Sequence, residues 1–220
     1  MLEIACFNLE SALLATRYGV SRIELCSGAT VGGTTPEQAD FHRLKESTII
    51  PVNIMIRPRG GSFIYTDEEF LLMQRSIETF RDQADGFVFG ILTDSGSVDE
   101  ERCSHLVRLA NGKHCTFHRA FDECRRLNEA ATAIIKCGFN AILTSGGLPT
   151  ALEGAEVVQT LQGNFQGQIS FIIAGSIRSG GARLLKEKMP AVEWFHSAAI
   201  VSQGEVANEI ELEVLSKYLA

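Results

Sequence analysis

The sequence contains no long apolar run and no excess of positive charge. Its 220 residues include 20 lysines and arginines against 27 aspartates and glutamates, which gives a net charge of −7 at pH 7. A chain of this charge is a poor general binder of nucleic acids or anionic membranes, so we expect neither as a partner. A short strand is predicted directly from Leu2, without the features of a signal peptide or a transmembrane helix. We therefore expect a cytoplasmic protein.

Cysteine spacing excludes two common kinds of site. The chain has no C-x-x-C pair and no cysteine–histidine cluster with zinc-finger spacing. In a cytoplasmic protein, most cysteines are expected to be reduced and buried as small apolar residues. The six cysteines are Cys6, Cys26, Cys103, Cys115, Cys124 and Cys137.

Short apolar β-prone runs alternate with amphipathic helical stretches along the whole chain. Eight such units, spaced by roughly 25–30 residues, predict a single (β/α)8 TIM-type barrel rather than an open sheet. We expect one domain over residues 1–220, with the barrel ending at about 200 and a final helix over 205–220. That helix is predicted to place Ile210, Val214, Leu215 and Tyr218 on one side.

Strand parity predicts which side chains fill the barrel. Because helices cover the outside, the apolar positions of each strand should face out and the alternate positions should face in. This places five charged or titratable residues inside: Glu3, Glu24, Arg57, His118 and His196. Buried carboxylates need partners, and Arg57 is the partner we expect for Glu3 and Glu24. We expect Glu3 to serve packing and Glu24, nearer the mouth, to contact a ligand.

The segment 54–61 ends a buried strand in two arginines, a proline and two glycines. Guanidinium groups at such a strand end suit a carboxylate or a phosphate, so Arg57 and Arg59 are candidate anion-binding residues. The alternative is a loop whose arginines pair with nearby acids.

A second polar segment, 116–122, ends the fifth strand. His118 is a candidate general acid or base, Asp122 could orient its ring or bind a hydroxyl group, and Arg119 could bind an anion. His196 is expected at the same mouth. The alternative is a histidine bonded to the backbone beside a loop salt bridge between Arg119 and Asp122.

Two glycine-rich turns follow the sixth and seventh strands. Thr144 and Gly146 belong to the first turn, and Gly175 and Ser176 belong to the second. Such turns present free N–H groups to an anion, and this fold commonly binds phosphate after its last strands. The alternative is a pair of tight turns without a ligand.

The motifs together resemble the CutC family, the copper homeostasis proteins. The resemblance runs in order from Leu2 to about Ala198. The segments that carry it are Arg22–Ser27, Gly32–Pro36, Met55–Gly61, Tyr65–Asp67, Thr116–Asp122, Leu143–Gly146 and His196–Ala198.

The resemblance implies a TIM-type barrel, a cytoplasmic and often dimeric protein, and a link to copper through Cu(I). The suspected ligands of the family are cysteines that end the first two strands. Cys26 matches the second position, whereas Ala5 stands at the first. Cys6 follows with the opposite parity and should point toward the helices. Met55 faces inward and could supply a second soft ligand.

Two functions are therefore expected as alternatives. The first is copper homeostasis, with Cu(I) bound at Cys26 and with Cys6 or Met55 as further ligands. The second is an enzyme or binder of a small anionic or phosphorylated metabolite. Its catalytic candidates are Glu24, Arg57, His118, Asp122 and His196. For either function we expect a homodimer or a higher homo-oligomer.

Overall fold

A closed parallel barrel forms the centre of the molecule. The computed structural model describes residues 1–201 and 204–220. Within them the strands pair in sequence order, and β1 also pairs with β8, which closes the barrel. The strands are β1 Leu2–Cys6, β2 Arg22–Leu25, β3 Val52–Met55, β4 Gly86–Phe89, β5 His114–Phe117, β6 Ala141–Thr144, β7 Ser170–Ile173 and β8 Trp194–Ser197.

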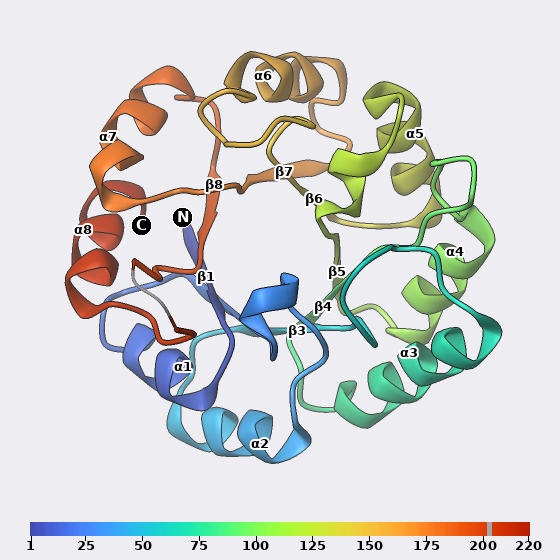
Figure 1. Cartoon of the computed structure of the whole chain (residues 1–220), viewed down its shortest axis with the longest axis horizontal. Helices are drawn as coiled ribbons and strands as arrows, with labels where there is room; N and C mark the ends of the chain where they lie inside the picture. Colours follow the sequence, from blue (N-terminus) through green and yellow to red (C-terminus); the bar gives the residue numbers. More distant parts are fainter. Residues whose placement is uncertain (202–203) are drawn as a thin grey trace.

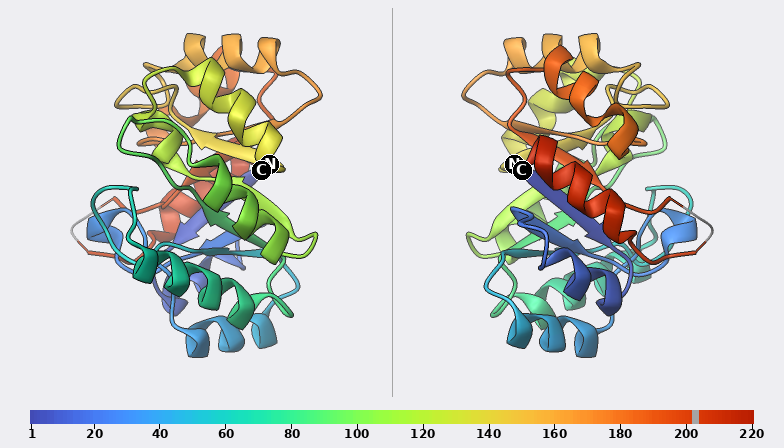
Figure 2. Two further views of the ribbon diagram at one scale, coloured as in Figure 1. Left: turned by 90° about the vertical axis from the view of Figure 1, so that its right-hand side faces the viewer. Right: turned by 90° about the vertical axis from the view of Figure 1, so that its left-hand side faces the viewer.

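A ring of helices surrounds the barrel, as Figure 1 shows. The two chain ends lie side by side at one end of the barrel (Figure 2). This architecture confirms the predicted (β/α)8 fold. The helices are α1 Leu9–Ala15, α2 Gln38–Ser47, α3 Asp67–Phe80, α4 Glu100–Leu109, α5 Leu127–Cys137, α6 Ala155–Asn164, α7 Ser179–Lys188 and α8 Glu209–Leu219.

The two faces of the strands belong to different clusters. Ile4, Ile23 and Phe117 are fully buried in the large apolar cluster between the strands and the helices. Cys26 and Met55 pack inside the barrel with Val88, as the alternation of the strands predicts. The predicted parity is therefore confirmed at these positions.

Helix ends follow from local chemistry in one case and depart from prediction in another. Thr66 caps α3 through a reciprocal capping box with Glu69, as expected for a threonine followed by acids. The final helix α8 begins at Glu209 and buries Leu212, Leu215 and Leu219. The predicted face was wrong for Ile210 and Tyr218, because both are exposed.

A short 3-10 turn, η1 (Ala29–Val31), follows β2 and lies across the barrel mouth. In Figure 1 it is the light-blue turn in front of the barrel centre, and Figure 2 shows it at the same end as the loop after β3. Gly28 and Gly32 flank it in the left-handed conformation, at φ 67° and 80°, which favours glycine. In the described part of the chain, no helix is long and apolar enough to span a membrane.

Candidate functional site

The first polar group of the barrel interior joins β1, β2 and β8. Arg22 Nε donates to Glu3 Oε2 at 2.5 Å, and His196 Nδ1 pairs with Glu3 Oε1 at 2.7 Å. The expectation that Arg57 pairs with Glu3 and Glu24 was therefore wrong, because the Arg57 guanidinium donates to backbone carbonyls and Glu24 Oε2 has no partner among the described residues. Arg22 precedes Glu24 by two residues, so the same parity that turned Glu24 inward also turns Arg22 inward.

Burial and charge oppose each other in this group. Burial works against ionisation of Glu3, but Arg22 and His196 outweigh it and hold its pKa at about 2. Burial raises the pKa of Glu24. Burial also works against a charged His196, yet the two carboxylates outweigh it and raise the pKa of that imidazole. Glu3 is therefore the residue that stays ionised, while the pKa values of Glu24 and His196 both lie above their ordinary values.

Below this group, the barrel floor contains a second histidine that the sequence analysis missed. Arg22 lies over the Trp194 ring, with its Cζ 4.1 Å from the ring centroid. Burial and the neighbouring Arg22 charge lower the pKa of His114 to about 4, so its imidazole is neutral near pH 7. His114 shares the parity of Thr116 and His118, which is the signal that could have placed it inside.

Arg57 holds the mouth loop rather than an acid. Its Nη1 donates to the carbonyl oxygens of Val31 at 2.7 Å and Gly33 at 3.0 Å, and its Nη2 donates to that of Gly61 at 2.8 Å. The guanidinium thus ties η1 to the loop after β3. Its Nε is buried without a partner among the described residues.

His118 lies next to Arg57 across an aromatic ring. The Phe63 ring packs against the imidazole at a tilt of 57° with centroids 4.7 Å apart, and the Arg57 Cζ lies 4.6 Å from the centroid of the same Phe63 ring. Nδ1 of His118 accepts from the amide of Ala120 at 3.3 Å, and its Nε2 is buried without a partner in the described chain. Burial and the Arg57 charge lower its pKa to about 3, so His118 is a neutral imidazole in the fold.

Arg59 is engaged by an acid of the next helix. Its Nε donates to Glu69 Oε1 at 2.6 Å and its Nη2 donates to Glu69 Oε2 at 3.1 Å, which is a bidentate pair. The same side chain donates to three loop carbonyls. This is the loop arrangement that the sequence analysis left as the alternative for Arg59.

The turn after β6 surrounds a carboxylate of the chain itself. Asp122 Oδ1 accepts from Thr144 Oγ1 at 2.5 Å and from the amide of Gly147 at 2.9 Å. The amide of Ser145 donates to both carboxylate oxygens at 3.1 Å. Arg119 Nε adds an ion pair at 2.8 Å. A carboxylate therefore fills the donor nest that was predicted to bind an external anion.

Other groups at this end are also engaged within the chain. The amide of Gly146 donates to Thr144 Oγ1 at 2.8 Å. A Cβ atom on Gly175 would lie 2.9 Å from Ser145 Cβ, so glycine is required there for close packing. Ser176 adopts a left-handed φ of 54° in the next turn. At the start of α7, the amide of Ser179 donates to the buried Glu211 carboxylate at 2.7 Å.

Two sulfur-containing side chains, Cys26 and Met55, pack in one cluster under the mouth loop. A Cβ atom on Gly33 would lie 3.5 Å from both Cys26 Sγ and Met55 Cε. Cys26 also donates to Glu24 Oε1 at 3.3 Å. Burial, and next the Glu24 carboxylate, raise the pKa of the Cys26 thiol. Cys6 belongs instead to the outer apolar cluster, which confirms its predicted orientation.

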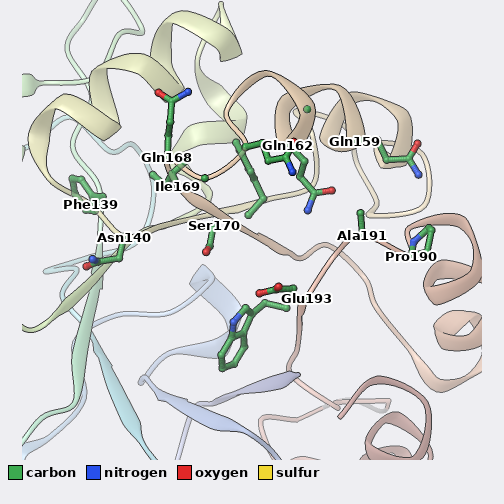
Figure 3. Close-up of a pocket in the computed structure, with 15 residues that line it drawn as sticks. Phe139, Asn140, Gln159, Gln162, Gln168, Ile169, Ser170, Pro190, Ala191 and Glu193 are labelled. Atoms are coloured by element: carbon green, nitrogen blue, oxygen red, sulfur yellow. The ribbon is translucent and has the colours of Figure 1, made fainter.

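A cavity of about 740 Å³ opens at the opposite end of the barrel. Figure 3 shows its lining where β6, β7 and β8 begin, with side chains such as Gln162, Gln168 and Glu193 around it. Catalytic sites of this fold form at the other end, where the strands finish. The polar groups described above, rather than this cavity, are therefore the candidate site.

The predicted catalytic residues thus fall into three groups. Glu24 and His196 share the cluster around Glu3, Arg57 and His118 share the Phe63 ring, and Asp122 occupies the β6 turn. The first two groups contain buried polar atoms without a partner in the described chain, whereas Asp122 is fully engaged.

Comparison with known proteins identifies the family of this chain. The model of the CutC family matches residues 1–201. The chain belongs to the CutC family. A mouse protein named copper homeostasis protein cutC homolog is 40% identical over 200 residues, which are 90% of this chain and 73% of the mouse protein. The resemblance stated from the motifs is therefore confirmed.

Solved structures agree with this assignment. The putative copper homeostasis protein CutC from Streptococcus agalactiae superposes with a TM-score of 0.84 at 27% identity, over 90% of this chain and 98% of that chain. Phosphoribosyl anthranilate isomerase from Thermotoga maritima gives a TM-score of 0.62 at 11% identity, over 99% of this chain and 97% of that chain. The isomerase shares the fold alone.

Proposed function

We propose that this member of the CutC family acts in copper homeostasis by binding Cu(I) inside the barrel mouth. The thiolate of Cys26 is the principal ligand and the thioether of Met55 is the second. One observation carries the proposal: Cys26 and Met55 pack in one cluster inside the barrel, and a Cβ atom placed on Gly33 would lie 3.5 Å from both Cys26 Sγ and the terminal methyl carbon of Met55. The names of the mouse and streptococcal relatives support a copper role.

Ligand chemistry favours copper in its reduced form. Cu(I) prefers soft thiolate and thioether ligands, which Cys26 and Met55 provide. Ala5 stands where the family resemblance suggests a first cysteine, so Met55 takes the place of a second thiolate. Burial raises the pKa of the Cys26 thiol, and a bound cation would offset that cost by stabilising the thiolate.

The experiment is a Cu(I) titration of the reduced, full-length protein against a chromogenic chelator. We expect one tightly bound ion in the native protein, no such ion in Cys26→Ser, and weaker binding in Met55→Leu. Cys103→Ser is the matched control, because Cys103 is equally buried but lies on α4. Unchanged binding in Cys26→Ser would refute the proposal.

A second candidate is a binder or enzyme of a small anionic metabolite at the same mouth. It keeps one observation in its favour, since Arg57 Nε and His118 Nε2 are buried without partners in the described chain. Arg57→Ala and His118→Ala would then abolish metabolite binding but retain Cu(I). A screen of phosphorylated metabolites by thermal shift, with both variants alongside, tests this candidate.

Cytoplasmic location and a homodimer belong to the same proposal, because the family resemblance implies both. Cell fractionation and light scattering of the purified protein test them. Recovery of the protein in a membrane fraction, or a monomer at every concentration, would contradict them.

A further inference from the structure

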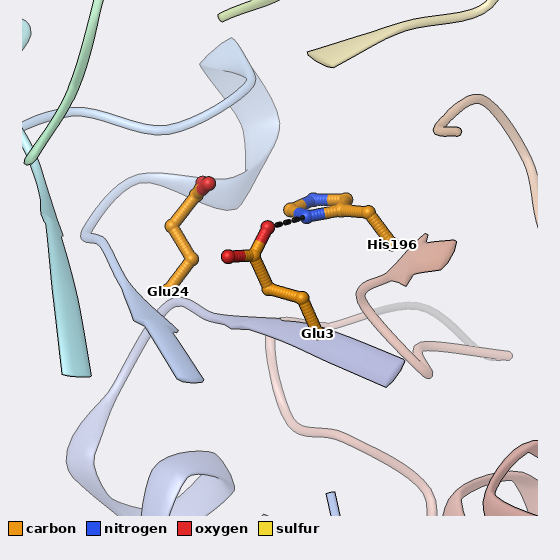
Figure 4. A group of neighbouring side chains, drawn as sticks. All are labelled: Glu3, Glu24 and His196. Atoms are coloured by element: carbon orange, nitrogen blue, oxygen red, sulfur yellow. Dashed lines mark hydrogen bonds and ion pairs between the residues drawn. The ribbon is translucent and has the colours of Figure 1, made fainter. Parts of the chain in front are cut away.

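Two carboxylates and an imidazole converge inside the barrel beside the proposed copper position. Glu3, Glu24 and His196 each offer a ligand atom, and these atoms lie within 4.8 Å of one another. Figure 4 shows the three side chains reaching toward one another from β1, β2 and β8. Their elements are neighbours in the barrel, because β1 pairs with both β2 and β8.

The hydrogen bonds of this group leave one atom unsatisfied. Both oxygens of Glu3 are engaged, one by Arg22 and one by His196 Nδ1. Glu24 Oε1 accepts from Cys26 Sγ at 3.3 Å, but Glu24 Oε2 has no partner among the described residues. Glu24 is only 2% exposed, so solvent does not supply that partner freely. An unpartnered buried carboxylate oxygen is costly, and a bound cation would satisfy it.

The bond between His196 and Glu3 has the form found at metal centres. A histidine that binds a metal commonly donates its other ring nitrogen to a carboxylate, which fixes the orientation of the ring. With Nδ1 bonded to Glu3, Nε2 is the ring nitrogen that remains for a metal ion.

Spacing and atom type select the class of ion. Zn²⁺ binds imidazole nitrogen and carboxylate oxygen at about 2.0–2.2 Å, which places tetrahedral ligands about 3.3 Å apart. The ligand atoms of the three residues lie within 4.8 Å of one another, so reaching that spacing requires shifts of up to about 1.5 Å. Oxygen ligands suit borderline and hard divalent ions better than Cu(I), which prefers sulfur.

We propose that Glu24 and His196, with Glu3 as the orienting carboxylate, form a site for a divalent transition-metal ion such as Zn²⁺. The site is separate in ligand chemistry from the Cys26–Met55 position, although Glu24 precedes Cys26 by only two residues on the same strand. The barrel then carries one soft and one borderline metal position along its interior.

The charges around the proposed site indicate which further ligand the metal ion would take. Glu3 and Glu24 carry two negative charges when ionised, and Arg22 returns one positive charge. A divalent ion with a neutral His196 leaves an excess of one positive charge. A solvent hydroxide on the open side of the ion balances that charge, and the His196 side chain, 12% exposed, is where solvent reaches the group.

The test is a competitive Zn²⁺ titration of the metal-free, reduced, full-length protein against a chromogenic chelator. We expect one tightly bound ion in the native protein. Glu24→Gln keeps the shape of the side chain but removes its charge, and we expect it to weaken binding by at least about 100-fold, as expected for loss of a ligand rather than an outer partner. His196→Gln should have a similar effect.

Two matched variants complete the design. Glu211→Gln changes another buried carboxylate, one already bonded to the amide of Ser179, and should leave Zn²⁺ affinity unchanged. Met55→Leu should lose Cu(I) affinity and keep Zn²⁺ affinity. Failure of the copper proposal and failure of this one are therefore distinguishable. Thermal melts of each variant show that it is folded, and Zn²⁺ should raise the melting temperature of the native protein but not of Glu24→Gln.

Two results would overturn the inference. One is a native protein that binds no Zn²⁺ beyond what Glu24→Gln binds. The other is equal stabilisation of the native protein and Glu24→Gln by Zn²⁺, which would place the ion elsewhere. In either case the unpartnered Glu24 oxygen would be bonded to an internal water molecule or carry a proton.

Discussion

Two regions of the molecule stabilise a buried carboxylate in different ways. One is the barrel interior beside β1, β2 and β8, and the other is the turn after β6. Both bury a carboxylate. At the β6 turn, amide, hydroxyl and guanidinium donors surround Asp122. In the interior, Glu3 has two partners while Glu24 retains an unpartnered oxygen. A fully engaged carboxylate indicates structure, whereas an unpartnered one indicates a place for a ligand.

The arginines of the molecule also differ in how deeply they are buried. Arg22 and Arg57 are almost fully buried, whereas the Arg59 side chain is 39% exposed. Buried ion pairs are expensive to break, because the remaining charge is left without a partner in a medium of low polarity. Exposed pairs contribute little, because solvent and salt screen them. The three arginines therefore allow the comparison to be tested by stability measurements.

The largest effect is expected for Arg22→Met. It leaves the ionised Glu3 without its guanidinium partner, and loss of one member of a buried pair costs about 3–5 kcal/mol of unfolding free energy. The control, Arg59→Met, should cost less than about 1 kcal/mol. Urea unfolding at pH 7 measures both. Similar losses in the two variants would show that burial does not separate these pairs.

A somewhat smaller effect is expected for Arg57→Met. The variant removes three hydrogen bonds from a charged donor to loop carbonyls, so we expect a loss of roughly 3 kcal/mol. Hydrogen exchange should accelerate in residues 28–34 and around Gly61, because Arg57 joins these segments. Unchanged exchange there would mean that the guanidinium does not hold the mouth loop, and would favour its role as an anion clamp.

The pH dependence of stability should reveal the lowered pKa of His118. Its pKa is about 3 in the fold, because of burial and the Arg57 charge, against 6.5 as the ordinary value. Below pH 6.5 the unfolded chain binds a proton that the folded chain excludes, so stability falls as the pH falls toward 3. The contribution is about 1.4 kcal/mol per pH unit, or roughly 2–3 kcal/mol between pH 7 and pH 4.5.

Two variants isolate that contribution. His118→Leu should reduce the slope of the unfolding free energy against pH by the equivalent of about one proton over this range. Phe63→Leu disturbs the packing against His118 but keeps the imidazole. The stability of this variant should therefore fall at every pH, while the slope of its unfolding free energy against pH is retained. If His118→Leu leaves the slope unchanged, the imidazole is protonated in the fold and could serve as an acid near neutral pH.

Strand alternation in the sequence was enough to predict the barrel and most of its interior. It placed Glu3, Glu24 and Cys26 inside because one rule, apolar positions outward, applies to every strand. It did not identify which charges pair. The pattern favours Arg57 as the partner of Glu3 because Arg57 lies on a nearby strand, but Arg22 is directly opposite Glu3 in the strand register. Pairing depends on strand stagger, which the sequence pattern does not contain.

Loop chemistry was harder to predict for a related reason. The motif around Thr144 and Gly146 predicts a nest of donors correctly, yet it does not say what fills the nest. The occupant, Asp122, follows a different strand and is brought there by the turn η2 (Arg119–Glu123). Glu211, which caps α7 from α8, was missed in the same way. Contacts between distant segments decide whether an anion site is open or already occupied.

The smallest effect is expected at the nest itself. Asp122→Ala should lose about 2 kcal/mol, because several amide and hydroxyl donors lose their acceptor. The vacated nest should then accept phosphate, as donor-rich turns of this kind do. Phosphate at tens of millimolar should raise the melting temperature of Asp122→Ala more than that of the native protein, with sodium chloride of equal ionic strength as the control. Equal shifts would mean that Asp122 does not occupy an anion site, and the fully engaged carboxylate would then serve only to fix the turn.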